Sequence, residues 1–213
     1  MTVRLLVLRH GPTVWNAEKR LQGQSDIPLS EAGRVRVAQW DLSTVGHALE
    51  SWSWFASPLS RASETAMILS AKLPEVPVVC SEPLAREMSW GSWEGERLPD
   101  LRERLGEEMR RMERLGLDFC PPQGESPRDV QRRIMPFLER VARVGTPGVL
   151  VAHKGILRAL YALATGWDMV GKPPEKLHND TAHLFRLSRY DGQGVRLEPD
   201  RLNIPLMERE SRE

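Results

Sequence analysis

Residues 3–8 read VRLLVL, and two later runs share this short apolar form: SWFAS at residues 53–57 and GVLVA at residues 148–152. Such runs are typical of buried strands in a parallel sheet, and parallel sheets bind ligands at the carboxyl ends of their strands. Basic residues follow the three runs: Arg9, His10, Arg61 and His153. The sequence therefore predicts that two histidines and two arginines converge on one crevice.

Helical patterns lie between these predicted strands. Ser30 is a candidate N-cap, and apolar residues follow it with helical spacing as far as Leu42. A second helix has an apolar face beginning at Ala62 and ends at Pro74, and a third opens at residues 124–130, GESPRDV. The alternation of strands and helices predicts an α/β fold, a three-layer α/β/α sandwich with a mostly parallel central sheet.

The remaining segments complete one predicted domain over residues 1–213. Two late runs, residues 182–187 and 194–198, indicate edge strands. Helical periodicity weakens at about residues 81–124, where glycines break an arginine-rich stretch. We interpret this stretch, called the insertion below, as a small lid over the site. The polar residues 208–213 are expected to be disordered.

Composition excludes several classes of partner. The net charge is only +1, which gives no reason to expect nucleic acid or an anionic membrane surface. No stretch approaches the roughly 18 consecutive apolar residues of a membrane span, and a cytoplasmic location is expected. Cys80 and Cys120 lack metal-ligand spacing and are expected to be reduced and buried. The oligomeric state stays open, with a homodimer among the possible assemblies.

The first strand continues as LRHGPTVWN, residues 8–16, and further motifs follow in order. They are QGQSDIPLSEAG at 22–33, SPLSRASETA at 57–66, LAREMSWGSWEG at 84–95, PPQGES at 121–126 and VAHKGILRAL at 151–160. Over nearly the whole chain these motifs resemble the histidine phosphatase superfamily, which includes the phosphoglycerate mutases. The resemblance implies a small phosphorylated substrate.

His10 is the candidate nucleophile. A neutral imidazole can attack a phosphomonoester if fixed cations stabilise the charge on the phosphoryl oxygens. Gly11 allows close backbone approach, and nearby arginines should lower the pKa of His10 and keep it neutral. An isolated histidine after a strand is more often a core residue bonded to a carbonyl, but the GPTVWN that follows His10 favours the nucleophile.

The arginines are the candidate phosphate ligands. Arg9 and Arg61 present planar guanidinium groups to phosphoryl oxygens, a geometry that lysine does not reproduce. Arg61 also opens a helix, whose N-terminus favours anions. Most other arginines are expected to be solvated at the surface. By the resemblance, Arg9, Arg61 and His153 form the phosphate pocket, and Asn16 offers its amide to the phosphate or the leaving group.

The leaving oxygen needs a proton, and a carboxyl group near the site is the expected source. Glu87 matches the general acid of the family by its spacing to Gly91, Trp93 and Gly95, whereas the alternative is an ordinary surface glutamate. Glu94 is the other candidate acid, although the family pattern places it in a structural turn.

The remaining candidate residues have weaker sequence support. Gln22, Gly23 and Ser57 match positions that line the family's pocket, and each also suits ordinary turn chemistry. Many relatives have glycine after the second histidine, where this chain has Lys154, which either contacts a second anionic group of the substrate or points to solvent. The same alternatives hold for five arginines of the insertion: Arg102, Arg104, Arg110, Arg111 and Arg114.

No metal or cofactor is expected. His178 and His183 have no carboxylate or thiolate at ligand spacing, and Gly11 and Gly23 form neither a P-loop nor a dinucleotide fingerprint.

Three functions fit these residues: a metal-independent phosphomonoesterase with a phosphohistidine on His10, a cofactor-dependent phosphoglycerate mutase, and a non-catalytic phosphate-binding protein. The insertion is shorter than that of the mutases and has GSWEGERLP in place of a GLNK-like stretch, which favours hydrolysis. A complete set of five candidate catalytic residues, Arg9, His10, Arg61, Glu87 and His153, argues against the non-catalytic reading.

Overall fold

The computed structural model describes residues 2–190 and 194–206. One sheet has the strand order β3-β2-β4-β1-β5-β6. The strands are β1 (Thr2–Arg9), β2 (Ser53–Ala56), β3 (Val79–Ser81), β4 (Gly148–Ala152), β5 (Thr181–Tyr190) and β6 (Gly194–Pro205). The first four run parallel, whereas β5 is antiparallel to β1 and β6 is antiparallel to β5. The predicted mostly parallel sheet is confirmed.

Helices connect these strands. The longer ones are α2 (Glu31–Ala38), α3 (Ser60–Ser70), α6 (Pro127–Val144) and α7 (Lys154–Thr165), and the shorter ones are α1 (Val14–Ala17), α4 (Leu98–Leu105) and α5 (Glu107–Glu113). Turns of 3₁₀ helix occupy Ser43–Val45, Leu49–Ser51, Pro83–Ala85, Gly91–Trp93 and Gly116–Asp118. Ser30 caps α2 as predicted, because its side chain accepts a hydrogen bond from the Gly33 N–H.

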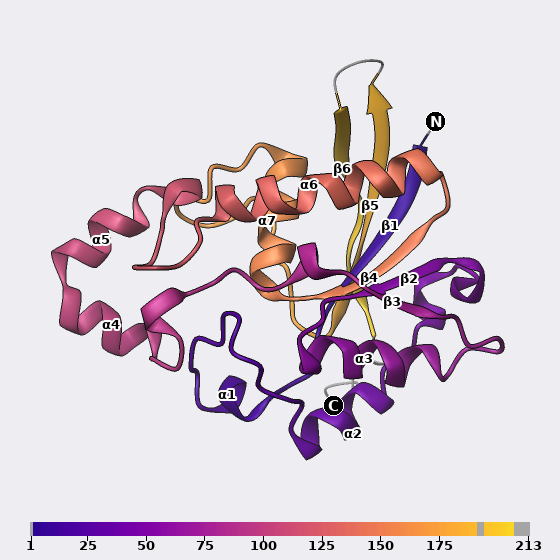
Figure 1. Ribbon diagram of the computed structural model, residues 1–213, viewed down its shortest axis with the longest axis horizontal. Coiled ribbons are helices and arrows are strands. Elements are labelled where there is room, and N and C mark those ends of the chain that lie inside the picture. The colour runs from indigo at the N-terminus through magenta and orange to yellow at the C-terminus, as the bar shows by residue number, and fades with distance from the viewer. Residues whose placement is uncertain (1, 191–193, 207–213) are drawn as a thin grey trace, which may run out of the picture.

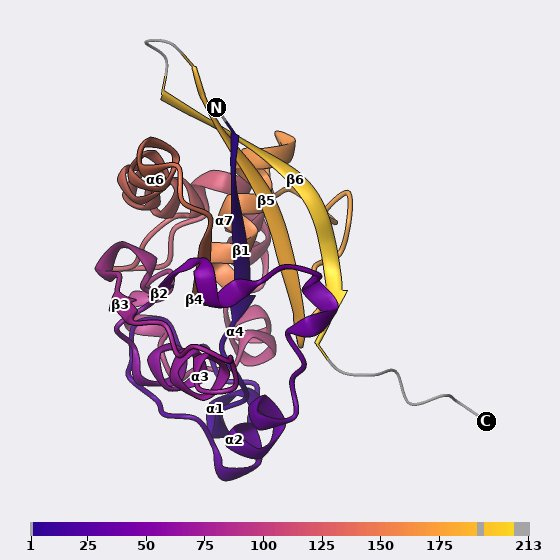
Figure 2. The ribbon, with the colours of Figure 1, turned by 90° about the vertical axis from the view of Figure 1, so that its right-hand side faces the viewer.

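The sheet separates two hydrophobic cores, as the alternation of side chains along β1 shows. Leu5 and Val7 pack into one core together with side chains of α6 and α7, whereas Leu6 and Leu8 pack into the other with side chains of α2 and α3. Figures 1 and 2 show these helix pairs on either side of the strands. The three-layer α/β/α sandwich is therefore confirmed, and it places the carboxyl ends of β1, β2 and β4 together at one edge.

Two predictions were wrong in detail. β5 is an interior strand, because it pairs with both β1 and β6, so of the two late strands β6 alone lies at an edge of the sheet. The β5 residues Ala182, Leu184, Phe185 and Leu187 are buried, as an interior position requires. Cys80 and Cys120 are free thiols but exposed, not buried, and Cys80 lies on the edge strand β3. Residues 208–213 lie outside the described part of the chain.

The insertion contains α4, α5 and three of the 3₁₀ turns. In Figure 1 its helices project to the left, away from the sheet. They contribute Leu98, Arg102, Met109 and Glu113 to the lining of a cleft that also reaches the strand ends. The insertion thus forms one wall of the site, whereas the sheet edge forms its floor.

Candidate active site

The predicted histidines meet where neighbouring strands end. Arg9 is the last residue of β1, with His10 directly after it, and His153 directly follows β4. The His10 backbone N–H donates to the carbonyl of Ala152 at 2.9 Å, which continues the ladder between the two strands. The two imidazole rings lie 5.1 Å apart between centroids. The hydrogen bonds between β1 and β4 thus hold both histidines at the carboxyl end of the sheet.

A cleft of about 620 Å³ opens at this edge. Eight of the ten predicted site residues line it: Arg9, His10, Asn16, Gln22, Gly23, Arg61, Glu87 and Lys154. The lining does not include His153 and Ser57, although His153 lies beside the His10 ring. The hydroxyl of Ser57 instead contacts Nε2 of His153.

His10 has the protonation state that a nucleophile needs. Its Nδ1 lies 2.7 Å from the carbonyl oxygen of Gly11, and because a carbonyl only accepts, Nδ1 carries the hydrogen. Burial, followed by the charges of Arg9 and Arg61, holds the pKa of His10 well below its ordinary value. The ring is therefore neutral at pH 7, with the lone pair on Nε2.

Arg61 is held rigidly at the start of α3. The side chain is fully buried, and its Nη1 and Nη2 donate to the carbonyls of Ser25 at 2.8 Å and Gly23 at 2.7 Å. Its Nε is buried without a hydrogen-bond partner, as is the Nε of Arg9. Burial lowers the pKa of both guanidinium groups, and the charge of Glu87 opposes that effect. Donors left unpaired in a cleft indicate an anionic ligand.

His153 is oriented from behind by Ser57. Its Nε2 lies 2.8 Å from Ser57 Oγ, which also accepts a hydrogen bond from the Leu59 N–H at 3.3 Å. The Nδ1 of His153 is buried without a partner. Burial, followed by the neighbouring His10 and the arginines, holds the pKa of His153 well below its ordinary value. If the Ser57 hydroxyl donates to Nε2, the hydrogen of neutral His153 lies on Nδ1, the atom that lacks a partner.

Glu87 lies near the start of the insertion and contacts the first turn of α7. Its Oε1 accepts from the Met88 N–H at 2.8 Å and its Oε2 from the Gly155 N–H at 3.1 Å. Burial raises the pKa of Glu87, although these two N–H groups and the charges of Arg61 and Arg9 oppose the rise. A raised pKa favours the protonated carboxyl group, which is the form that a general acid requires.

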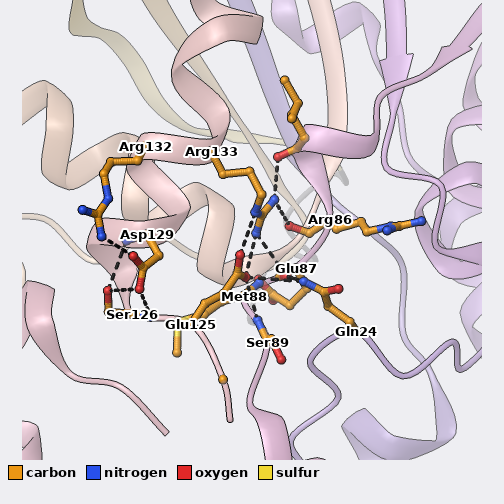
Figure 3. A network of polar contacts seen from close by, with 12 residues as sticks. Gln24, Arg86, Glu87, Met88, Ser89, Glu125, Ser126, Asp129, Arg132 and Arg133 are labelled. Carbon is orange, nitrogen blue, oxygen red and sulfur yellow. Dashed lines mark hydrogen bonds and ion pairs between the residues drawn. The ribbon is translucent and has the colours of Figure 1, made fainter.

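A network that the sequence did not predict fixes the segment of Glu87 (Figure 3). Arg133 on α6 donates to the carbonyls of Leu84 at 2.6 Å and Arg86 at 3.0 Å, and its Nε and Nη2 bind Glu125 at 2.8 and 2.9 Å. Glu125 in turn accepts from the Ser89 N–H at 3.0 Å. The segment that carries Glu87 is therefore tied to α6 on both sides of the carboxyl group.

Glu94, the alternative acid, is already occupied. Its carboxylate accepts from the N–H groups of Gln24 at 2.9 Å and Ser25 at 2.8 Å, and from the Trp90 N–H at 3.2 Å. A Cβ at Gly23, whose φ is +51°, would lie 2.0 Å from the same carboxylate. Glu94 therefore braces the loop that holds Arg61, and glycine at position 23 makes room for it.

The remaining predicted residues lie along the same cleft. Asn16 lines the cleft, and its Oδ1 accepts from the Thr13 N–H at 3.1 Å in a capping box. Gln22 has a buried Oε1 without a partner. Of the five arginines of the insertion, only Arg102 lines the cleft, and it pairs with Glu113 at 2.7 Å.

Two further findings concern the chain outside this cleft. His183, one of the histidines considered for metal, is buried with a pKa that burial lowers to about 4, and its Nδ1 accepts from the Asn203 N–H. Within residues 2–190 and 194–206, no three His, Cys, Asp or Glu side chains gather closely enough to hold a metal ion. In the same ranges, no helix combines the length and the apolar composition that crossing a bilayer requires.

Comparison with known proteins places these features in context. A family model for the histidine phosphatase superfamily (branch 1) matches residues 5–199. A 2,3-bisphosphoglycerate-dependent phosphoglycerate mutase of Methylobacterium sp. (strain 4-46) is 33% identical over 194 residues, 86% of this chain and 91% of the mutase. Phosphoglycerate mutase-like protein 4 of Arabidopsis thaliana is 32% identical over 191 residues, 88% of this chain and 80% of the plant protein.

The similar solved structures include a phosphatase. A mycobacterial glucosyl-3-phosphoglycerate phosphatase, solved in complex with VO3, superposes with a TM-score of 0.76 and is 26% identical. The match covers 94% of this chain and 98% of the phosphatase. The chain is thus similar to proteins named as mutases and to a protein named as a phosphatase.

Proposed function

This chain belongs to the histidine phosphatase superfamily, and we propose that it is a phosphomonoesterase that hydrolyses small phosphorylated metabolites through a phosphohistidine on His10. One observation carries the proposal. A neutral His10 with a free Nε2 lone pair and a Glu87 with a raised pKa line the same cleft as Arg9 and Arg61, whose buried Nε atoms lack hydrogen-bond partners.

In the first step, Nε2 of His10 attacks phosphorus and the bond from phosphorus to the alcohol oxygen breaks. Glu87 gives its proton to the departing oxygen, so the alcohol leaves neutral. Arg9, Arg61 and the Nδ1–H of His153 donate to the equatorial oxygens, where negative charge is concentrated. The Gly11 carbonyl accepts from Nδ1 of His10 and stabilises the positive charge that the ring gains.

In the second step, water attacks the phosphoryl group on the opposite side from Nε2. The Glu87 carboxylate, deprotonated in the first step, accepts a proton from this water, and the bond from phosphorus to Nε2 breaks. Inorganic phosphate leaves, and His10 and Glu87 return to their starting protonation states. In this proposed cycle the charges of Arg9 and Arg61 stabilise the phosphoryl oxygens, and no metal ion takes part.

A phosphoglycerate mutase is the second candidate, because curated relatives at 31 to 34% identity carry that name. A mutase must exclude water while its phosphohistidine is presented with a second hydroxyl. In this chain the wall opposite the sheet consists of two short helices, α4 with 8 residues and α5 with 7. Such a small wall supports access of water and thus hydrolysis.

The two activities can be measured side by side on protein that has been treated with EDTA and then desalted, with Mg²⁺ added only together with the coupling enzyme. We expect phosphate release from at least one small phosphomonoester to exceed the formation of 2-phosphoglycerate from 3-phosphoglycerate with catalytic 2,3-bisphosphoglycerate, followed by coupling to enolase. Mutase turnover above phosphate release from every ester tested would make the chain an isomerase instead. A His10→Asn variant supplies the background for both assays.

A further inference from the structure

The cleft extends beyond the phosphoryl site, and four cations that the proposed reaction does not use line it: Arg20, Arg102, Lys154 and Arg158. Arg20 pairs with Glu18 and Arg102 with Glu113, whereas Lys154 and Arg158 are free of such pairs among the described residues. Lys154 and Arg158 lie four residues apart on α7, so their side chains project from the same face of that helix. Both line the cleft that also contains His10 and Glu87. One wall of the cleft therefore presents two positive charges close together.

In the described part of the chain, Lys154 and Arg158 lack the carboxylate partner that Arg102 has. Among the described residues neither Lys154 nor Arg158 has a carboxylate within ion-pair distance, whereas Arg102 on the opposite wall pairs with Glu113. The Arg158 guanidinium lies 5.2 Å over the Trp167 ring, which holds it in place without neutralising it. Partial burial lowers the pKa of both groups. A bound anion would offset this cost of desolvation.

The position of the pair relative to Glu87 indicates which part of a substrate it faces. The Gly155 N–H, next to Lys154, donates to Glu87 Oε2 at 3.1 Å, so the first turn of α7 lies against the acid. Because Glu87 protonates the leaving oxygen in the proposed reaction, the alcohol part of the substrate lies beside Lys154. Arg158 follows one helical turn further along the cleft.

We propose that Lys154 and Arg158 form a second anion subsite, which binds a carboxylate or second phosphate on the alcohol part of the phosphomonoester. The inference rests on the proposed phosphatase activity, since Glu87 sets the direction of the leaving group. The cleft also has apolar lining from Leu98, Met109 and Phe119, which lacks charge to compete for that anion. The preferred substrate class is therefore a small metabolite with at least two anionic groups.

The test compares substrates that differ only in the second anion. 3-Phosphoglycerate and glycerol 3-phosphate differ by a carboxylate, and fructose 1,6-bisphosphate and fructose 6-phosphate differ by a phosphate. We expect the wild type to prefer the more anionic member of at least one pair by tenfold or more in kcat/KM. Lys154→Gln and Arg158→Gln should each lower that preference ratio about tenfold, as the loss of one charge-assisted contact predicts.

Matched variants separate charge from folding. Lys154→Arg and Arg158→Lys keep the charge and should retain most of the preference, and Arg143→Gln, which removes an exposed charge on α6 outside the cleft, should leave the ratio as it is. Equal ratios in the wild type and the Gln variants would overturn the subsite.

Failure of the proposed function gives a different result. If no ester is hydrolysed, the phosphatase proposal fails, and the dissociation constants of 3-phosphoglycerate and glycerol 3-phosphate are then measured by calorimetry. The subsite is supported if Lys154→Gln selectively weakens binding of 3-phosphoglycerate, and it is rejected if both ligands are affected equally or neither is.

Discussion

The floor and the wall of the cleft are built differently. On the floor, Arg61 and His153 are fully buried, and backbone carbonyls or a buried hydroxyl orient their side chains. On the wall formed by the insertion, charged side chains pair with one another near the surface: Arg102 with Glu113, Arg104 with Glu96 and Arg110 with Glu107. The groups proposed to meet the phosphoryl oxygens are preorganised, whereas the exposed ion pairs of the insertion leave their side chains more freedom.

This contrast has an energetic basis. Burying a cation costs free energy, which hydrogen bonds or a bound anion must offset. A buried cation is therefore expected where an anion binds. Exposed ion pairs stabilise a fold little and can be exchanged at small cost. We therefore expect substitutions on the floor to abolish activity, and substitutions on the wall to have small effects unless they change contacts to the substrate.

The largest effect is expected for His10→Asn. The amide can still donate to the Gly11 carbonyl but cannot form the phosphohistidine, so kcat should fall by about 10⁴-fold or more. Phosphate release from p-nitrophenyl phosphate measures this loss, with a melting curve as the control for folding. Residual activity within tenfold of the wild type would remove His10 from the nucleophile role.

Glu87→Gln should have a large effect that depends on the leaving group. An alkyl phosphate needs the proton and should be hydrolysed about 10²- to 10⁴-fold more slowly, whereas p-nitrophenyl phosphate, with its good leaving group, should lose far less. The comparison of kcat for the two esters separates this role from phosphate binding. Equal losses would transfer the acid role to another group, with Glu94 tested next.

The pH dependence of the rate should also report the role of Glu87 as general acid. Because burial raises the pKa of Glu87, alkyl phosphate hydrolysis should persist above the ordinary titration range of a carboxyl group and fall as the pH rises through the raised pKa. Because the pKa of His10 is lowered, the nucleophile should stay neutral as the pH falls below the ordinary histidine range. The alkaline fall should be absent from Glu87→Gln, and a wild-type profile in that variant would contradict the assignment.

A moderate effect is expected at the junction of floor and wall. Arg133→Gln removes the fork that binds the carbonyls of the Glu87 segment, so alkyl phosphates should lose about tenfold more in kcat than p-nitrophenyl phosphate. Arg133→Lys should restore part of that ratio. A loss of stability with an unchanged ratio would show that Arg133 supports the fold but does not position the acid.

The smallest effect should come from the wall itself. Arg104→Ala breaks the exposed pair with Glu96, and Arg104 does not line the cleft, so the melting temperature should shift by less than about 3 °C. The rates should change by less than twofold. A tenfold change in rate would mean that the insertion takes part in the reaction and would break the contrast between floor and wall.

The floor was largely predictable because its signals are local. A buried strand has a short apolar run, and the residue that follows it lies at the carboxyl end of the sheet, so the location of Arg9, His10 and His153 was predictable from position. Their roles came from the motifs around them. The family suggested by the motifs is confirmed over residues 5–199. The interior position of β5 was missed because strand order depends on pairings far apart in the sequence.

The residues that hold the catalytic side chains in place, such as Arg133, were not predictable from local sequence signals. Arg133 lies on the amphipathic helix α6 among several other arginines, and its partners Leu84 and Arg86 are 49 and 47 residues away. Their carbonyls carry no sequence signal. Ser57 was predicted by resemblance as a lining residue, but the structure buries it behind His153, because the last hydrogen bonds of β2 draw its backbone into the sheet.

The most direct test of the account is the position of the phosphoryl group in the intermediate. After rapid quenching at alkaline pH, where a phosphoramidate survives, peptide mapping and ³¹P NMR identify both the residue and the ring nitrogen. Because Nδ1 of His10 donates to the Gly11 carbonyl, the account predicts phosphate on Nε2 of His10. Phosphate on Nδ1, on another residue, or on no residue during steady turnover would contradict it.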